Sequence, residues 1–117
     1  MDFRIIRNTQ VITDSDLALS LDLLPKSFIS FFKRNIKVFP QDTYFQLTEE
    51  EKKDLVKNYC LTHAERLRYA KRLPYVFTPS GAVLAIFLLK RCKTAASLRQ
   101  KLLASITQKE LSNILSI

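Results

Sequence analysis

The sequence contains little glycine, histidine and cysteine, and each shortage excludes a class of site. The single glycine among 117 residues cannot form a glycine-rich loop of the kind that cradles phosphates. His63, the only histidine, is more simply a half-buried structural residue than a catalytic base. Cys60 and His63 have the spacing of half a zinc site, but only Cys92 is left as another soft ligand. We therefore expect no enzymatic activity, no cofactor or metal, and two free, buried thiols.

Long hydrophobic runs are also missing. The longest wholly apolar run covers residues 82–89, whereas a transmembrane helix needs about 18 or more. The first ten residues lack the apolar segment of a signal peptide. With 47% hydrophobic residues, including eight Phe and four Tyr, the chain can bury a sizeable core within one domain. We expect a cytoplasmic protein with no membrane partner.

Acidic residues are absent between Asp22 and Asp42, where the sequence predicts a helix over residues 25–37 with two unlike faces. At about 100° per residue, one face gathers large apolar side chains: Phe28, Phe31, Phe32, Ile36 and Phe39. The other face carries Lys26, Ser30, Lys33 and Lys37, with Ser27 and Arg34 on its flank. In a chain of net charge +8, such a face indicates a helix that lies against nucleic-acid phosphates. An ordinary solvated basic face explains this segment about as well.

The preceding residues predict a second helix joined to this one by a short turn. Thr13 is a suitable N-cap, and Asp14 and Asp16 lie in the first turn, where the helix dipole favours negative charge. After residue 21, Asp22 suits a left-handed turn, and Pro25 suits the first turn of the next helix. Two helices joined so closely have the outline of a helix-turn-helix, with residues 25–37 as the recognition-like helix.

Two further features bear on this candidate interface. A second basic cluster precedes a predicted strand and consists of Arg66, Arg68, Lys71 and Arg72. Asn35 falls by helical angle on the apolar side of its helix, where a buried amide needs hydrogen-bond partners. The favoured interpretation is that Asn35 tethers the backbone of residues 38–42, and the alternative is a contact with a base.

Short β-prone runs predict a small antiparallel sheet. Residues 3–6 and 10–12 form a hairpin with Asn8 in its turn, and residues 43–47 pair with residues 74–77. Between the last two runs, Thr48 and Glu51 form a capping box that opens a helix to about residue 64, with Leu55 and Tyr59 inward. The three glutamates 49–51 fan around that helix and face solvent, so they do not converge on a metal.

The last third of the chain predicts three more helices. Thr78 and Pro79 start the first, and Gly81 in its first turn indicates a close backbone contact. Residues 82–89 are apolar all round, so this helix should be central, and the cations of residues 90–93 suit its negative end. The second helix starts at Thr94 and turns Leu98, Leu102 and Ile106 inward. A capping box over residues 107–110 opens a short last helix.

Four of these segments, in this order, resemble a known family. They read VITDSDLA at 11–18, RNIKVFP at 34–40, YFQLTEEE at 44–51 and LPYVFTPSG at 73–81. The pattern is similar to the ORF-six-N domain, found at the front of phage antirepressor-type proteins and related to KilA-N domains. The resemblance covers residues 3 to about 106 and implies a small α+β, DNA-binding domain of phage or prophage origin that acts in gene regulation. We therefore expect a domain over residues 1–106 and a short C-terminal helix over residues 107–117.

The residues and the resemblance together predict a DNA-binding regulatory domain built from helix-turn-helix-like helices on a small antiparallel sheet. The predicted contacts with double-stranded DNA are Lys26, Ser27, Ser30, Lys33, Arg34, Lys37, Arg66, Arg68, Lys71 and Arg72. The alternative is a protein-interaction module that binds and blocks a repressor without contacting DNA, and a homodimer is compatible with either. Exposed, coplanar cations favour DNA, whereas a dominant exposed apolar patch favours a protein partner.

Overall fold

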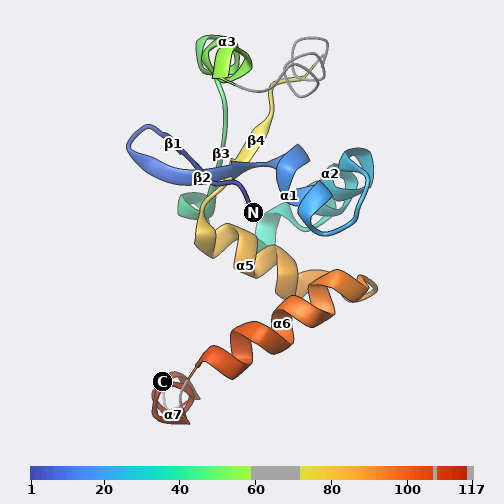
Figure 1. The fold of residues 1–117 in the computed structure, drawn as a ribbon, viewed down its shortest axis with the longest axis vertical. Coiled ribbons are helices and arrows are strands. Elements are labelled where there is room, and N and C mark those ends of the chain that lie inside the picture. Colours follow the sequence, from blue (N-terminus) through green and yellow to red (C-terminus); the bar gives the residue numbers. More distant parts are fainter. Residues whose placement is uncertain (59–71, 107, 116–117) are drawn as a thin grey trace.

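A four-stranded antiparallel sheet divides the helices of an α+β fold into two layers (Figure 1). This computed structural model describes residues 1–58, 72–106 and 108–115. The strands β1 (Arg4–Ile6), β2 (Thr9–Thr13), β3 (Tyr44–Gln46) and β4 (Tyr75–Phe77) lie in the order β1-β2-β4-β3. The helices are α1 (Asp14–Ser20), α2 (Pro25–Arg34), α3 (Glu49–Asn58), α5 (Pro79–Leu88), α6 (Lys93–Ser105) and α7 (Gln108–Leu115). The predicted fold class and strand pairings are confirmed, and no helix in the described part is long and apolar enough to cross a membrane.

Each face of the sheet carries its own apolar core, because successive residues of a strand point to opposite faces. Ile12 of β2 pairs with Phe77 of β4, and both pack with residues of α1, α2 and α5. Val11 and Val76 belong to the other core, together with Leu55 of α3. A shift of one residue in the pairing would exchange the two sets of side chains. The register of these short strands is therefore fixed by burial on both faces.

The N-terminal hairpin turns through two residues in the left-handed conformation. Arg7 has φ 55° and Asn8 has φ 58°, the geometry of a tight turn whose twist matches that of the flanking strands. Asn tolerates this conformation well, whereas Arg adopts it at a cost of about 1–2 kcal/mol. The hairpin was predicted from Asn8, and the structure confirms it with Ile6 paired to Thr9.

The two-helix unit is formed by α1 and α2. Thr13 caps α1 by accepting a hydrogen bond from the backbone N–H of Asp16 at 3.2 Å. Asp22 turns the chain with φ 58°, and Pro25 is the first residue of α2, both as predicted. The predicted end of α2 was wrong: the helix stops at Arg34, and a separate 3₁₀ turn (Ile36–Val38) follows. Lys37 is therefore on that turn and not on the helix itself.

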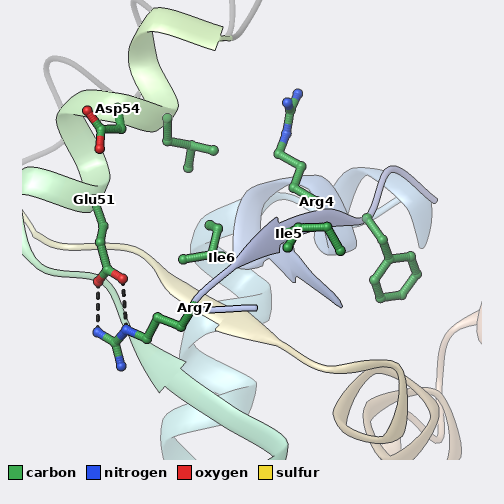
Figure 2. A pocket seen from close by; sticks show the side chains of 8 residues that line it. Arg4, Ile5, Ile6, Arg7, Glu51 and Asp54 are labelled. Atoms are coloured by element: carbon green, nitrogen blue, oxygen red, sulfur yellow. Dashed lines mark hydrogen bonds and ion pairs between the residues drawn. The ribbon is translucent and has the colours of Figure 1, made fainter. Parts of the chain in front are cut away.

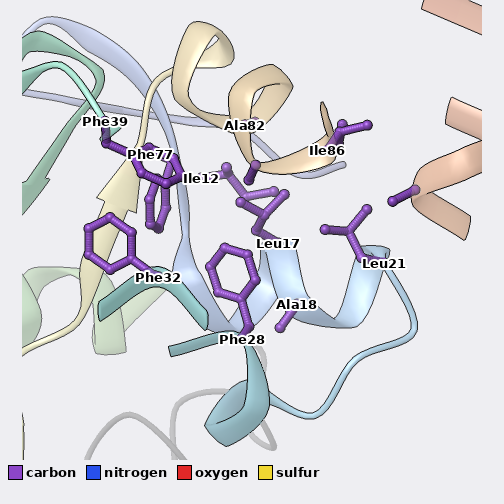
Figure 3. Close-up of a cluster of buried hydrophobic side chains, with 12 residues drawn as sticks. Ile12, Leu17, Ala18, Leu21, Phe28, Phe32, Phe39, Phe77, Ala82 and Ile86 are labelled. Carbon is purple, nitrogen blue, oxygen red and sulfur yellow. The ribbon is translucent and has the colours of Figure 1, made fainter. Parts of the chain in front are cut away.

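Aromatic rings from α2 and β4 form the centre of the larger core (Figure 3). The Phe32 ring is fully buried and makes edge-on or tilted contacts with four other rings, at centroid distances of 4.9–5.1 Å. Phe28 and Phe39 are buried as predicted, whereas Phe31 and Ile36 are only partly buried. Ile29, which the helical pattern did not assign to the apolar side, is buried. The buried stripe of α2 is thus centred on Phe28, Ile29 and Phe32.

Asn35 has the structural role that was favoured, but with a different partner. Its side-chain amide Nδ2 donates to the carbonyl of Phe31 at 2.8 Å, one turn back along α2. The predicted tether to residues 38–42 is made by the backbone instead, because the N–H of Val38 donates to the carbonyl of Asn35. The bond from Val38 satisfies the carbonyl of Asn35, which is left open where α2 ends. The side-chain amide of Asn35 is engaged separately, with the carbonyl of Phe31.

Gly81 lies where the backbone of another segment comes into contact, as its position in the sequence indicated. A side-chain carbon built on Gly81 would overlap the carbonyl oxygen of Thr43. That oxygen also accepts hydrogen bonds from the backbone N–H and the hydroxyl of Thr78, at 3.0 and 3.3 Å. Thr78 in turn caps α5 by accepting from the N–H of Gly81 at 3.2 Å. One junction therefore joins the start of β3, the end of β4 and the first turn of α5.

The substitution Gly81→Val should destabilise the protein by about 1–3 kcal/mol, because the added carbons must displace the Thr43 carbonyl and weaken its two hydrogen bonds. Chemical denaturation followed by circular dichroism measures this difference. Ser80→Val is the matched control in the same turn, since Ser80 is exposed and surface changes usually stay within about 0.5 kcal/mol. Equal stabilities of the two variants would show that Gly81 has no such packing role.

The prediction that α5 is central is only half right. Ala82, Ala85 and Ile86 are buried, but Val83 and Phe87 on the other side are 37% and 41% exposed.

The next helix, α6, begins at Lys93, one residue earlier than predicted, because the sulfur of Cys92 accepts from the N–H of Ala95. Leu98 and Leu102 are partly buried against the larger core. Tyr59, Cys60, His63, the predicted helix end at residue 64 and Thr107 lie outside the described residues.

Candidate nucleic-acid interface

The solvent-facing side of α2 carries the polar residues that the sequence assigned to it. We term these six residues the α2 basic face: Lys26, Ser27, Ser30, Lys33, Arg34 and Lys37. All six side chains are exposed; five stand on α2, and Lys37 stands on the 3₁₀ turn that follows. The face is held in place because the opposite stripe of the same helix is buried in the aromatic core.

The electrostatics of the α2 basic face favour an anion. Among the described residues, no acidic side chain forms an ion pair with its four cations. The first turn of α2 contains no acidic residue, and the N-cap Leu24 contributes no side-chain hydrogen bond. No carboxylate in this first turn offsets the positive end of the helix dipole, which adds to the field of Lys26 at that end of α2. Hydroxyls of Ser27 and Ser30 between the cations are further groups that bind phosphate oxygens.

Of the second predicted basic cluster, only Arg72 lies within the described residues. Arg66, Arg68 and Lys71 lie outside the described residues. Arg72 is 39% exposed, and its guanidinium Nη1 donates to the carboxylate of Asp14 at 2.8 Å. The structure therefore does not bring Arg72 to the α2 basic face as an unpaired cation, and its predicted DNA contact stays a prediction.

Asp14 has a role that the sequence did not reveal. Its side chain is 1% exposed, and one carboxylate oxygen accepts from Arg72 and from the backbone N–H of Tyr75 at 3.0 Å. The other oxygen accepts from the hydroxyl of Ser15 at 3.3 Å. Asp14 was predicted only as a dipole-complementing residue of the first helical turn. It also joins the start of α1 to the start of β4, a contact between segments about 60 residues apart that periodicity cannot indicate.

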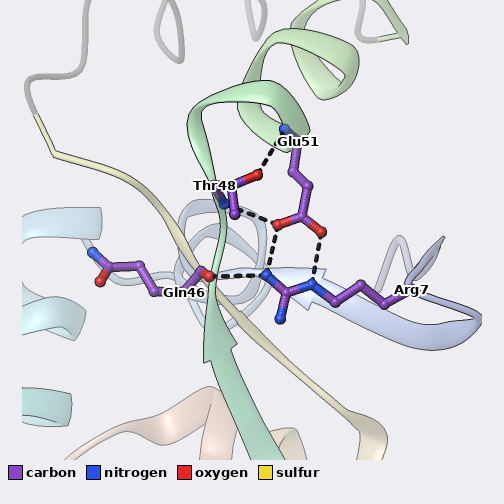
Figure 4. A network of polar contacts seen from close by, with 4 residues as sticks. All are labelled: Arg7, Gln46, Thr48 and Glu51. Atoms are coloured by element: carbon purple, nitrogen blue, oxygen red, sulfur yellow. Dashed lines mark hydrogen bonds and ion pairs between the residues drawn. The ribbon is translucent and has the colours of Figure 1, made fainter.

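A concave region with a volume of about 650 Å³ lies between β1 and α3 (Figure 2). Its charged lining residues are Arg4, Arg7, Glu51 and Asp54. Arg7 donates from Nε and Nη2 to the two carboxylate oxygens of Glu51, each at 2.7 Å (Figure 4). The Arg7 guanidinium also lies over the ring of Phe45, with 4.3 Å from Cζ to the ring centroid. This pairing holds the hairpin turn against the first turn of α3.

Glu51 is held in its ionised form by its hydrogen bonds. The hydrogen bonds from Arg7 lower its pKa from 4.5 to about 2, and burial opposes this shift only in part. The carboxylate also accepts from the N–H of Thr48 at 2.9 Å, while the Thr48 hydroxyl accepts from the N–H of Glu51, which confirms the predicted capping box. The prediction that all three glutamates simply face solvent was wrong for Glu51. A carboxylate ionised and paired in this way is poorly suited to donate or abstract protons near pH 7.

The lowered pKa of Glu51 predicts a pH-dependent stability. Because the folded-state pKa is below the unfolded value, the Glu51 contribution is present above about pH 4.5 and disappears as the pH falls through about 2. Melting temperatures of the parent and of Glu51→Gln should differ at pH 7 and converge between about pH 4.5 and pH 2. Solvent reaches both Arg7 and Glu51, so added salt should reduce the difference in melting temperature at pH 7. A gap that is unchanged at pH 2 would contradict this assignment.

A family model described as the ORF6N domain matches residues 3–87. The matched range holds all four strands, α1, α2, α3 and nearly all of α5, whereas α6 and α7 lie beyond it. Ala95 of α6, which is buried in the larger core, is therefore outside the match. No curated protein and no solved structure matches the chain. Within the described ranges, no three His, Cys, Asp or Glu residues are grouped so that they hold a metal ion.

Proposed function

The chain belongs to the ORF6N domain family, a phage-type domain, and we propose that it is a regulatory domain of phage or prophage antirepressor type that binds double-stranded DNA. The α2 basic face carries this proposal. It is exposed, it has no acidic neighbour in sequence between Asp22 and Asp42, and it is fixed on a helix whose other side is the core. A helix presented in this way after a short turn is the arrangement that helix-turn-helix proteins use at DNA.

The composition of the α2 basic face favours phosphates over base edges. Lysine and serine bind phosphate oxygens, whereas recognition of bases relies on side chains that make two parallel hydrogen bonds. Of the six residues only Arg34 has such a group, and the amide of Asn35 is engaged with the carbonyl of Phe31. We propose that binding is largely independent of DNA sequence. We further propose a cytoplasmic binding protein without enzymatic activity, in line with the paired and ionised state of Glu51.

The paired substitution Lys33→Ala and Lys37→Ala should weaken binding to random duplex DNA and leave the melting temperature nearly unchanged, because both side chains are exposed and make no ion pair among the described residues. If each lysine neutralises one phosphate, the slope of log affinity against log salt should fall in magnitude by about 1.8. Fluorescence anisotropy over a series of salt concentrations measures both affinity and slope. The loss should be nearly the same for every duplex sequence.

A matched control removes two lysines elsewhere. Lys53 and Lys57 are exposed on α3, which lies on the other side of the sheet from α2 (Figure 1). The paired substitution Lys53→Ala and Lys57→Ala lowers the net charge equally and should change the salt slope much less. If both pairs have the same effect, only the net charge matters. If the parent and the α2 variant bind equally well at low salt, α2 is not the DNA surface.

The alternative of a repressor-binding module is favoured by one observation. An apolar groove of about 270 Å³ runs between the N-terminal residues, α5 and α6, with the partly exposed Val83 on its wall. Exposed apolar surface beside polar residues is typical of protein-binding sites. The substitution Val83→Ser should leave DNA binding unchanged and should weaken binding to a purified repressor if the groove is that site. A parent protein that does not bind duplex DNA at low salt would favour this alternative over the first proposal.

A further inference from the structure

The turn between α5 and α6 presents a second group of cations. Lys90, Arg91 and Lys93 are all exposed, and among the described residues none of them forms an ion pair or a side-chain hydrogen bond. The sequence contains no acidic residue between Glu65 and Glu110, so the field of these cations is not weakened from their own segment. Along α6, Lys93, Ser97 and Lys101 follow at intervals of four residues and are also exposed. This repeats the alternation of cation and hydroxyl seen on the α2 basic face.

The backbone of this turn is held rigidly. Arg99 of α6 reaches back and donates from Nη1 to the carbonyls of Ile86 and Leu89, at 2.8 and 2.7 Å. These carbonyls lie where α5 ends and would otherwise lack partners. Cys92 caps α6 through its sulfur. A turn fixed from both sides loses little conformational entropy when its side chains bind a ligand.

The same turn is fastened to the α1–α2 connection. The Cys92 thiol donates to the carbonyl of Leu21 at 3.3 Å, and the Thr94 hydroxyl donates to the carboxylate of Asp22 at 2.6 Å. Asp22 lies at the turn that leads into α2, and its carboxylate is the only one between Asp16 and Asp42. The bond to Thr94 therefore engages the carboxylate that precedes the α2 basic face in sequence. In Figure 1, the α5–α6 turn lies beside this connection, close to where α2 begins.

We propose that Lys90, Arg91 and Lys93 form a second contact with the sugar-phosphate backbone of the duplex that the α2 basic face binds. This inference rests on the proposed function and extends it to a two-part footprint. Contacts from a fixed turn beside a groove-binding helix set the register and orientation of a protein on DNA without reading bases. The Cys92 thiol and the Thr94 hydroxyl position the turn, and the three cations contact the phosphates.

The test compares four proteins on the same random duplex by fluorescence anisotropy from low to high salt. They are the parent, the α2 pair Lys33→Ala and Lys37→Ala, the turn pair Lys90→Ala and Lys93→Ala, and the α3 control pair Lys53→Ala and Lys57→Ala. The turn pair should reduce the salt slope by about 1.8, which widens its affinity gap from the parent about 60-fold for each tenfold dilution of salt. A fifth protein, the charge-conserving pair Lys90→Arg and Lys93→Arg, should bind like the parent.

The outcomes separate this inference from the proposed function. If the α2 pair loses affinity and the turn pair behaves like the α3 control, the turn makes no DNA contact and the proposed function stands. If the turn pair loses affinity and the α2 pair does not, the two-part footprint is overturned together with the role of α2, and the turn alone contacts DNA. A parent that does not bind duplex DNA overturns both. Equal losses in all three pairs show an effect of net charge alone and also overturn the turn contact.

Discussion

Phe32→Ala should lower the free energy of unfolding by about 3–5 kcal/mol, because a fully buried aromatic ring is replaced by a cavity that its neighbours cannot fill. The ring lies against Phe39, Tyr44, Tyr75 and Phe77, which come from three different segments of the chain: the stretch after the 3₁₀ turn, β3 and β4. Edge-to-face contacts of this kind contribute about 0.5–1.5 kcal/mol each beyond the burial of area. The truncation therefore weakens the attachment of α2 to the sheet at its centre.

Phe31→Ala is the comparison that tests this assignment. The helical pattern assigned Phe31 and Phe32 alike to the apolar face, but Phe31 is only partly buried and, among the described residues, has one ring contact, with Phe28 at 5.8 Å. Its truncation should cost less than that of Phe32 by at least about 1 kcal/mol. Urea unfolding followed by circular dichroism measures both. Equal costs would mean that the centre of the core does not lie at Phe32.

Local signals in the sequence predicted most of the secondary structure. Thr13, Thr48 and Thr78 mark helix starts because each hydroxyl accepts a hydrogen bond from the backbone N–H only three residues further along the chain. Asn8 and Asp22 mark turns because their own side chains tolerate the left-handed conformation. In each case the cause and the structure lie in the same short segment. A single sequence is sufficient for this kind of inference.

Contacts between distant segments could not be predicted in the same way. Glu51 was correctly predicted in its capping box, but its ion pair with Arg7 spans 44 residues and depends on how the hairpin meets α3. The apolar run in α5 indicated burial on all sides, yet the neighbouring elements cover only one side and leave Phe87 exposed. Hydrophobicity specifies that a face can be buried. The arrangement of the other elements decides whether it is.

In the candidate site, too, the local features were predictable and the contacts between distant segments were not. Exposure of Lys26, Lys33 and Arg34 was predictable because the helical period that buries Phe28 and Phe32 turns them outward. The basic turn over residues 90–93 was predicted only as a complement to the dipole of α5. Its place beside the α1–α2 connection depends on the bond from Cys92 to Leu21, which are 71 residues apart. No pattern within either segment indicates that contact.

Arg72→Met should destabilise the protein by about 3 kcal/mol, because it leaves the buried carboxylate of Asp14 without its cation. Removing one partner of a buried ion pair typically costs about 3–5 kcal/mol, and the lower end applies since water reaches Arg72. Methionine keeps most of the apolar stem, so the loss reports on charge more than on packing. Thermal or urea unfolding of the variant measures the effect.

The double variant Asp14→Asn with Arg72→Met distinguishes a structural ion pair from a DNA contact. Asparagine keeps an oxygen that accepts from the N–H of Tyr75 but removes the unpaired charge, so part of the stability lost in Arg72→Met should return. The single Arg72→Met variant should bind DNA at low temperature, where it is folded, with the same salt slope as the parent, because its guanidinium is engaged with Asp14. A variant with parental stability and a slope reduced by about 1 would reverse the assignment and make Arg72 a phosphate contact.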